Sequence, residues 1–147
     1  MKRKTHLIVG SVMTLPVASL IGAISPIYVI ITFLGTIAPD FDSDFGLKHR
    51  GASHSLVAAT LTGIIFSALF GVKVGLIWTV AYCSHLFLDS LTKMGVPFLY
   101  PINKKRFGIR KFRTNGLMDN WFILVGLGVA VLVVLEIVIN GVLSFIR

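Results

Sequence analysis

The stretch "75-GLIWTVAYCSHLFLDSLTKMG-95" decides the fold of this chain, because a long apolar run within it carries a histidine and an aspartate four residues apart. Residues at positions i and i+4 lie on the same face of an α-helix. His85 and Asp89 therefore point in one direction. Ionisable groups within an apolar helix are costly and are usually paired with partners inside a bundle, so we expect further polar residues to meet this pair.

The composition of the whole chain indicates an integral membrane protein. Of its 147 residues, 55% are hydrophobic and 14% charged, with a mean hydropathy of +0.88, whereas a soluble domain carries about 25% charged residues. The apolar residues form five blocks, at 7–23, 27–38, 55–72, 74–91 and 120–146. A membrane span needs about 17–25 residues, so the second block is short. We predict an all-α, integral membrane bundle of four to five transmembrane helices, in one domain over residues 1–147.

The first block resembles a secretory signal in one respect, since Lys2, Arg3 and Lys4 precede it. It contains Pro16, lacks a small-residue cleavage site and is followed directly by another apolar run. We therefore expect it to be retained as the first helix. The single cysteine, Cys83, cannot form an intrachain disulfide and is expected to be a small buried apolar residue.

The basic residues predict the orientation in the membrane. Six of them lie in the segment 104-KKRFGIRKFR-113. With five helices and a cytoplasmic N-terminus, all of the 14 basic residues except Lys73 and Arg147 fall on the cytoplasmic side, as the positive-inside rule requires. The net charge of +8 is then explained by topology and by anionic lipid headgroups, and no nucleic-acid partner is expected.

Titratable residues gather on that same predicted side. His6 begins the first block, Asp40 follows the second, His54 precedes the third, and His85 and Asp89 end the fourth. The topology was derived from lysine and arginine alone, so this placement is an independent observation. Histidine nitrogen and aspartate oxygen are typical zinc ligands. We predict a metal site formed by His6, Asp40, His54, His85 and Asp89. The alternative without a metal is that His85 is a hydrogen-bonded core histidine and Asp89 pairs with Lys93.

Within this cluster, His54, His85 and Asp89 are the preferred ligands of a first ion, and His6 shares Asp89 at a second. Asp40 is either a further ligand or the general base that orients water. Arg50 either binds phosphate bidentately or is only one of the basic residues that set the orientation in the membrane.

Three other polar residues are expected to support the site. Asp42 and His49 are candidates for contacts behind the ligands, and the sequence leaves open whether His49 is itself a ligand. Asp119 either caps the last helix or belongs to the site.

These residues carry a resemblance to a known family. The segments "THLIVG" at 5–10, "APDFDS" at 38–43, "HRGASHS" at 49–55 and "HLFLDSLTKMGVPFLYP" at 85–101 resemble the YdjM-like inner-membrane proteins, which are described as metal-dependent hydrolases. The order of His6, Asp40, His54, His85 and Asp89 is also similar, more remotely, to the ligand order of zinc phospholipase C and P1 nuclease. That likeness implies phosphoester hydrolysis at one or two zinc ions, with Asp89 bridging two; manganese is a second choice of metal.

The sequence therefore predicts a membrane-bound, metal-dependent hydrolase that acts on a lipid phosphoester at the cytoplasmic face of the inner or plasma membrane. The main alternative is a carrier of metal ions or protons, and a third is a non-catalytic scaffold or regulator that uses its basic loop. Against a carrier, the predicted ligands lie at one membrane face only. Neither the lipid nor the oligomeric state can be read from the sequence.

Overall fold

The computed structural model describes residues 2–23, 25–44, 46, 50–109, 112, 116, 117 and 120–130. The helices are α1 (Arg3–Leu20), α2 (Pro26–Ile37), η1 (Ala38–Asp40), α3 (Phe41–Asp44), η2 (Ala52–His54), α4 (Leu56–Phe70) and α5 (Val72–Ser90). The all-α prediction is confirmed, since the described residues form helices, turns and two isolated β-bridges.

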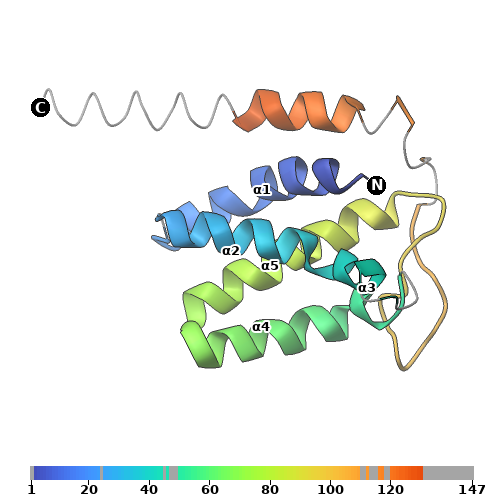
Figure 1. The fold of residues 1–147 in the computed structure, drawn as a ribbon, viewed down its shortest axis with the longest axis horizontal. Coiled ribbons are helices and arrows are strands. Elements are labelled where there is room, and N and C mark those ends of the chain that lie inside the picture. Colours follow the sequence, from blue (N-terminus) through green and yellow to red (C-terminus); the bar gives the residue numbers. More distant parts are fainter. Residues whose placement is uncertain are drawn as a thin grey trace, which may run out of the picture.

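Four long helices form two antiparallel hairpins, α1–α2 and α4–α5 (Figure 1). Helix α5 is the central element, because it packs against α1, α2 and α4. Its side chains Ile77, Leu86 and Leu88 are fully buried. This arrangement brings the first turn of α1, the end of α2, the start of α4 and the last turn of α5 to one end of the bundle.

Local sequence explains where the helices begin and end. Pro26 starts α2 at a position where its missing N–H is no loss. The Ser55 hydroxyl caps α4 by accepting the Ala58 N–H at 3.1 Å, as serine commonly does at the start of a helix. Gly71, with φ of +96°, separates α4 from α5, and this conformation is one that glycine adopts without strain.

Small residues allow the helices to approach closely. A Cβ atom added at Gly10 would lie 2.8 Å from the Ser84 hydroxyl, and one added at Gly35 would lie 2.9 Å from the Ala81 Cβ. Glycine at such positions lets backbones come together, as is common between helices in membranes. The contacts of Gly10 and Gly35 join α1 and α2 to α5 directly above His85.

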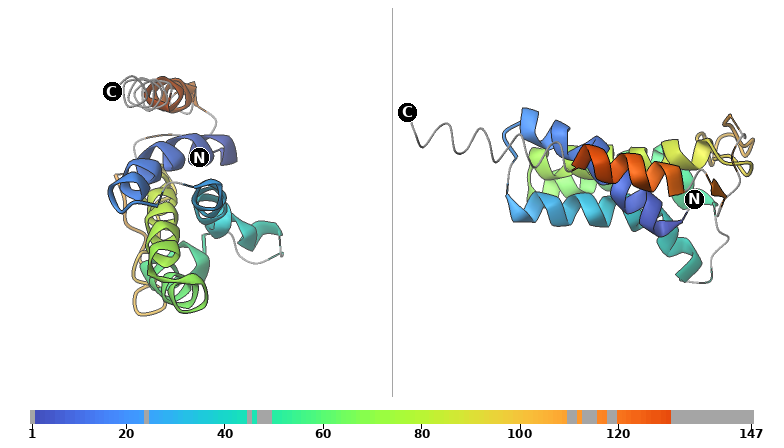
Figure 2. Two further views of the ribbon diagram at one scale, coloured as in Figure 1. Left: turned by 90° about the vertical axis from the view of Figure 1, so that its left-hand side faces the viewer. Right: turned by 90° about the horizontal axis from the view of Figure 1, so that it is seen from above.

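The apolar blocks predicted from the sequence correspond to α1, α2, α4 and α5. Residues 120–130 of the fifth block are helical and lie beside α1 (Figure 2), where a Cβ at Gly126 would meet Ile8 at 2.8 Å. Residues 131–146 of that block lie outside the described part. Within the ranges described, no helix combines the length and the apolar character that crossing a bilayer requires.

The segment after α5 folds back over the end of the bundle. Val96 and Phe107 exchange two main-chain hydrogen bonds, of 2.9 and 2.8 Å, and form an antiparallel bridge. The Leu56 N–H donates to the Phe98 carbonyl at 3.0 Å. This hairpin therefore lies against the start of α4, next to the residues of η2.

Candidate metal centre

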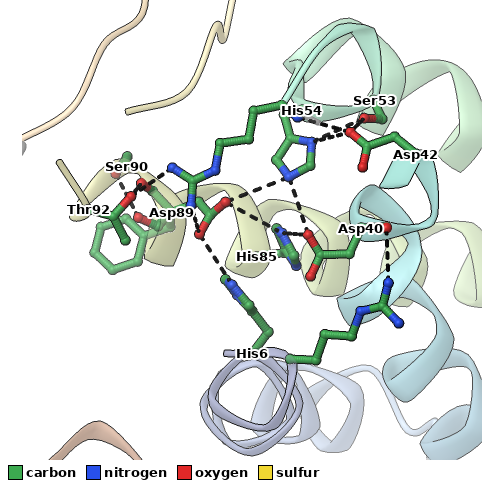
Figure 3. Close-up of polar contacts among 12 residues, drawn as sticks. His6, Asp40, Asp42, Ser53, His54, His85, Asp89, Ser90 and Thr92 are labelled. Atoms are coloured by element: carbon green, nitrogen blue, oxygen red, sulfur yellow. Dashed lines mark hydrogen bonds and ion pairs between the residues drawn. The ribbon is translucent and has the colours of Figure 1, made fainter. Parts of the chain in front are cut away.

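Five titratable side chains meet at this end of the bundle (Figure 3). They are His6 of α1, Asp40 of η1, His54 of η2, and His85 and Asp89 of α5. All five residues are buried. The structure thus brings together every residue that the sequence proposed as a metal ligand, from four segments that are distant along the chain.

The antiparallel order of the helices explains this convergence. An up-and-down chain returns to the same end after every second helix, so residues near 6, 40, 54 and 89 become neighbours. Within α5, His85 and Asp89 lie one turn apart on one face, as their spacing predicts. The turn formed by η1 and α3 then continues the direction of α2 and carries Asp40 beneath His54 and His85.

Two sets of three residues have the spacing of metal ligands. One set is His6, Asp40 and His85, and the other is His54, His85 and Asp89; in each set the ligand atoms lie within 4.8 Å of one another. The second set is the one that the sequence favoured for the first ion. Around a tetrahedral zinc ion with bonds of about 2.0–2.1 Å, two ligand atoms lie about 3.3–3.4 Å apart.

The observed separations approach that value. The His54 Nε2 atom lies 3.6 Å from Asp40 Oδ1 and 3.6 Å from Asp89 Oδ2. The His85 Nε2 atom lies 3.5 Å from Asp40 Oδ1 and 3.9 Å from Asp89 Oδ2. His6 Nε2 lies 3.3 Å from Asp89 Oδ1. Small shifts of side chains would therefore place these atoms around one cation.

The ring of His85 is held in the orientation that a metal ligand needs. Its Nδ1 atom lies 2.7 Å from the main-chain carbonyl of Thr36. A carbonyl only accepts hydrogen bonds, so Nδ1 carries the proton and donates. In the neutral ring Nε2 is then an acceptor, and this buried atom makes no hydrogen bond within the described residues. Ligating histidines commonly donate their other N–H to a carbonyl in this way.

His54 is oriented by a carboxylate. Its Nδ1 lies 3.3 Å from Asp42 Oδ2 and 3.1 Å from the Ser53 hydroxyl. The same Asp42 oxygen accepts the Ser53 hydroxyl at 2.8 Å and the Arg50 N–H at 3.0 Å. Asp42 therefore lies behind His54, in the supporting position that the sequence suggested. This arrangement directs His54 Nε2 toward Asp40 and Asp89.

The cluster contains two carboxylates, Asp40 and Asp89, and one buried cation, Arg50, which contacts Asp89. With Nδ1 of His85 protonated, its Nε2 lone pair faces two carboxylate oxygens, and acceptors facing acceptors in a buried site are unfavourable unless a positive charge lies between them. Burial raises the pKa of Asp40, but its contact with His54 and the nearby His85 and His6 outweigh burial and lower the pKa to about 2. Asp40 is therefore ionised at physiological pH, and the donor set fits a divalent metal such as zinc.

His6 completes the cluster from α1. Its ring stacks on that of His85, with centroids 3.7 Å apart and planes inclined by 13°. This contact fixes the distance between α1 and α5 at the site. The rings of His54 and His85 meet edge to face at 5.3 Å. His85 therefore contacts both other imidazoles, and the three rings form one packed group.

Arg50 is turned inward and not toward solvent. Its side chain is 3% exposed, and its Nη2 lies 2.8 Å from Asp89 Oδ1. Its Nη1 donates to the Thr92 hydroxyl at 2.8 Å. The role in binding phosphate that the sequence suggested for Arg50 stays a prediction, because both terminal nitrogens are engaged by the protein.

Two groups that contact the cluster, the Thr36 carbonyl and the Thr92 hydroxyl, were not predicted from the sequence. The Thr36 carbonyl left no signal, because every residue carries a main-chain carbonyl. Thr92 follows Asp89 by three residues, and its hydroxyl also donates to the Asp89 carbonyl at 2.8 Å. His49 and Asp119, both proposed as supporting residues, lie outside the described residues.

A shallow apolar groove, largely open to the surface, lies at the start of α4. It has a volume of about 310 Å³ and is lined by Leu56, Phe98, Leu99 and Phe107. Leu56 is the first residue of α4 and follows His54 by two residues.

The chain matches one family of known proteins. A family model described as YdjM inner membrane protein matches residues 1–146, which confirms the resemblance read from the sequence and extends it beyond residue 101. Among curated proteins and solved structures no match is found. The more remote likeness to zinc phospholipase C and P1 nuclease stays a prediction.

Proposed function

The chain belongs to the YdjM inner membrane protein family, and on this basis we propose that it is a membrane-bound, metal-dependent hydrolase whose substrate is a lipid phosphoester. The observation that carries the proposal is the buried meeting of three imidazoles and two carboxylates, in which the Nε2 atom of His85 faces Asp40 and Asp89. Zinc is the preferred metal and manganese the second choice. When bound, such an ion would activate water and polarise a phosphoryl oxygen.

In this proposal His54, His85 and Asp89 hold the ion. Thr36 and Asp42 keep the two imidazoles in the tautomer that leaves Nε2 available. Asp40 contributes its ionised carboxylate as a further ligand or as the acceptor that orients water. Asp40 Oδ1 lies 3.6 Å from His54 Nε2 and 3.5 Å from His85 Nε2, close to the separation of two ligands on one ion, so we favour the ligand role.

The surface of the bundle supports a membrane setting and a lipid substrate. Large apolar side chains are exposed along two helices: Ile27, Ile30, Phe33 and Leu34 on α2, and Leu61, Ile64, Ile65 and Leu69 on α4. The interior combines an apolar core around α5 with buried hydroxyl and imidazole groups. Extended apolar surface of this kind marks contact with a membrane or a partner. The groove beside His54 would receive part of a lipid chain.

We further propose that the metal centre faces the cytoplasm in a multi-pass arrangement. Basic residues gather at the end of the bundle that carries the site, including Lys4 of α1 and Lys93 beyond α5. Lys73 lies at the opposite end, where it donates to the Gly22 carbonyl at 3.4 Å. This asymmetry agrees with the positive-inside rule.

The test is hydrolysis by purified protein in detergent. Wild-type protein loaded with zinc is incubated with phospholipids and polyprenyl phosphates, and metal content and product are measured on the same samples. We expect wild-type protein to release product and His85→Ala to lose both metal and turnover. Lys73→Gln, at the far end of the bundle, is the control and should keep both.

Two outcomes would replace the proposal. Metal-loaded protein that hydrolyses no member of a broad phosphoester and acyl ester panel would favour a carrier of metal ions or protons. Wild-type protein without bound transition metal would favour a scaffold or regulator.

A further inference from the structure

A buried arginine lies within the candidate metal centre, and it bears on how many ions the centre holds. Arg50 has φ of +59°, a left-handed conformation that is uncommon for residues other than glycine. Its main-chain N–H donates to Asp42, and its Nη1 donates to Thr92. These contacts hold the guanidinium inside the cluster. The inference below rests on the proposed metal site.

The ligands of the two possible ions overlap at His85. Both three-residue sets include this residue. Its Nδ1 donates to the Thr36 carbonyl at 2.7 Å, so only Nε2 can bind metal. A single imidazole nitrogen coordinates one ion, and the two sets as they stand cannot be filled together.

Two ions would require a different division of the ligands. His54, His85 and Asp89 Oδ2 would hold the first, and His6, Asp40 and Asp89 Oδ1 the second, with Asp89 bridging. Asp89 Oδ2 lies on the side of the first ion, 3.6 Å from His54 Nε2 and 3.9 Å from His85 Nε2. Asp89 Oδ1 lies 3.3 Å from His6 Nε2, but it also lies 2.8 Å from Arg50 Nη2.

We propose that Arg50 takes the place of a second metal ion, so that the centre binds a single ion. The guanidinium contacts the Asp89 oxygen that a second ion would need, and it supplies a fixed positive charge at that point. A second divalent cation would have to share this oxygen with the guanidinium and would be repelled by its buried positive charge. Arg50 is thus a positioning residue that acts through Asp89.

Residues just beyond the last turn of α5 hold the Arg50 guanidinium in place. The Thr92 hydroxyl accepts from Arg50 Nη1 and donates to the Asp89 carbonyl. Arg50 Nη1 also lies 3.4 Å from the Gly95 carbonyl. Removal of the guanidinium would take away its positive charge and its contact with Asp89 Oδ1, beside His6 Nε2, and so favour binding of a second cation there.

The experiment measures zinc per chain after equilibration with excess zinc and removal of free metal, without any assay of activity. Wild-type protein should bind one ion per chain, and Arg50→Gln should bind two. Arg50→Lys retains a cation and should bind one. Lys93→Gln removes an exposed charge near the same end of α5 and should also bind one. With Mn²⁺ in place of zinc, electron paramagnetic resonance should show isolated ions in wild type and coupled pairs in Arg50→Gln.

If Arg50 only stabilised the fold, Arg50→Gln should bind fewer zinc ions than wild type, because a damaged fold loses metal and does not gain it. Two bound ions in wild-type protein would overturn the inference whether or not any variant folds, and leave the proposed hydrolase intact. A folded Arg50→Gln protein that binds one ion would overturn it as well. Wild-type protein without metal would instead remove the proposed function on which the inference rests.

Discussion

The support that Asp42 gives to His54 leads to a quantitative prediction. Asp42→Asn keeps the shape of the side chain and an oxygen that can accept from Ser53 and the Arg50 N–H, but it removes the negative charge beside His54 Nδ1. A hydrogen bond to a charged group contributes about 1.5–3 kcal/mol, and one between neutral groups about 0.5–1.5 kcal/mol. The difference is about 1–2 kcal/mol.

Because about 1.4 kcal/mol corresponds to a tenfold change in affinity, zinc affinity should fall roughly 10-fold, within the range of about 10–100-fold typical for groups behind a metal ligand. The assay is competition for zinc with a chromophoric chelator in detergent. Ser53→Ala, which removes one hydroxyl contact and keeps the carboxylate, should weaken binding less. An Asp42→Asn protein that is folded and binds zinc as tightly as wild type would refute the assigned role of Asp42.

Three further predictions address packing, metal and topology. Gly10→Ala should lower the free energy of unfolding by about 1–3 kcal/mol, because its Cβ would lie 2.8 Å from the Ser84 hydroxyl; an unchanged thermal transition would contradict this. Zinc removal by a chelator should lower the unfolding temperature of wild-type protein but hardly that of His85→Ala, since bound ligand stabilises the folded state; equal shifts in both would argue against the site. In a variant lacking Cys83, a cysteine at Ile109 should not react with an impermeant thiol reagent in intact cells, and labelling there would reverse the proposed orientation.

The candidate site could be predicted from the sequence because it depends on regular features, namely the spacing within a helix and the alternating direction of successive helices. His85 and Asp89 share a face through their spacing, and the antiparallel order of apolar blocks places His6, Asp40 and His54 at the same end. The contacts that orient these groups could not be predicted. The Thr36 carbonyl depends on how α2 packs on α5, and the direction of Arg50 depends on a left-handed backbone angle in a loop.

The helical fold was also predicted, but the short turns between the helices were not. The sequence predicts that the second block ends at residue 38, and α2 ends at Ile37, in agreement. The turn η1, which follows α2 directly and carries Asp40 into the site, was not predicted. The third and fourth blocks meet at Gly71 in a turn with almost no loop. Such turns depend on single φ angles and not on hydrophobic pattern.

The division of the ligands between the two hairpins has a consequence for biosynthesis. The first hairpin, α1–α2 with the turn that follows it, carries His6 and Asp40, which alone make too few ligands to retain an ion. The second, α4–α5 with η2, carries His54, His85 and Asp89, a complete three-residue set. If the centre binds an ion as proposed, the first hairpin would leave the ribosome without a complete ligand set, and an ion could be captured only after the last turn of α5 has been made. Assembly of the centre would then be a late step in folding.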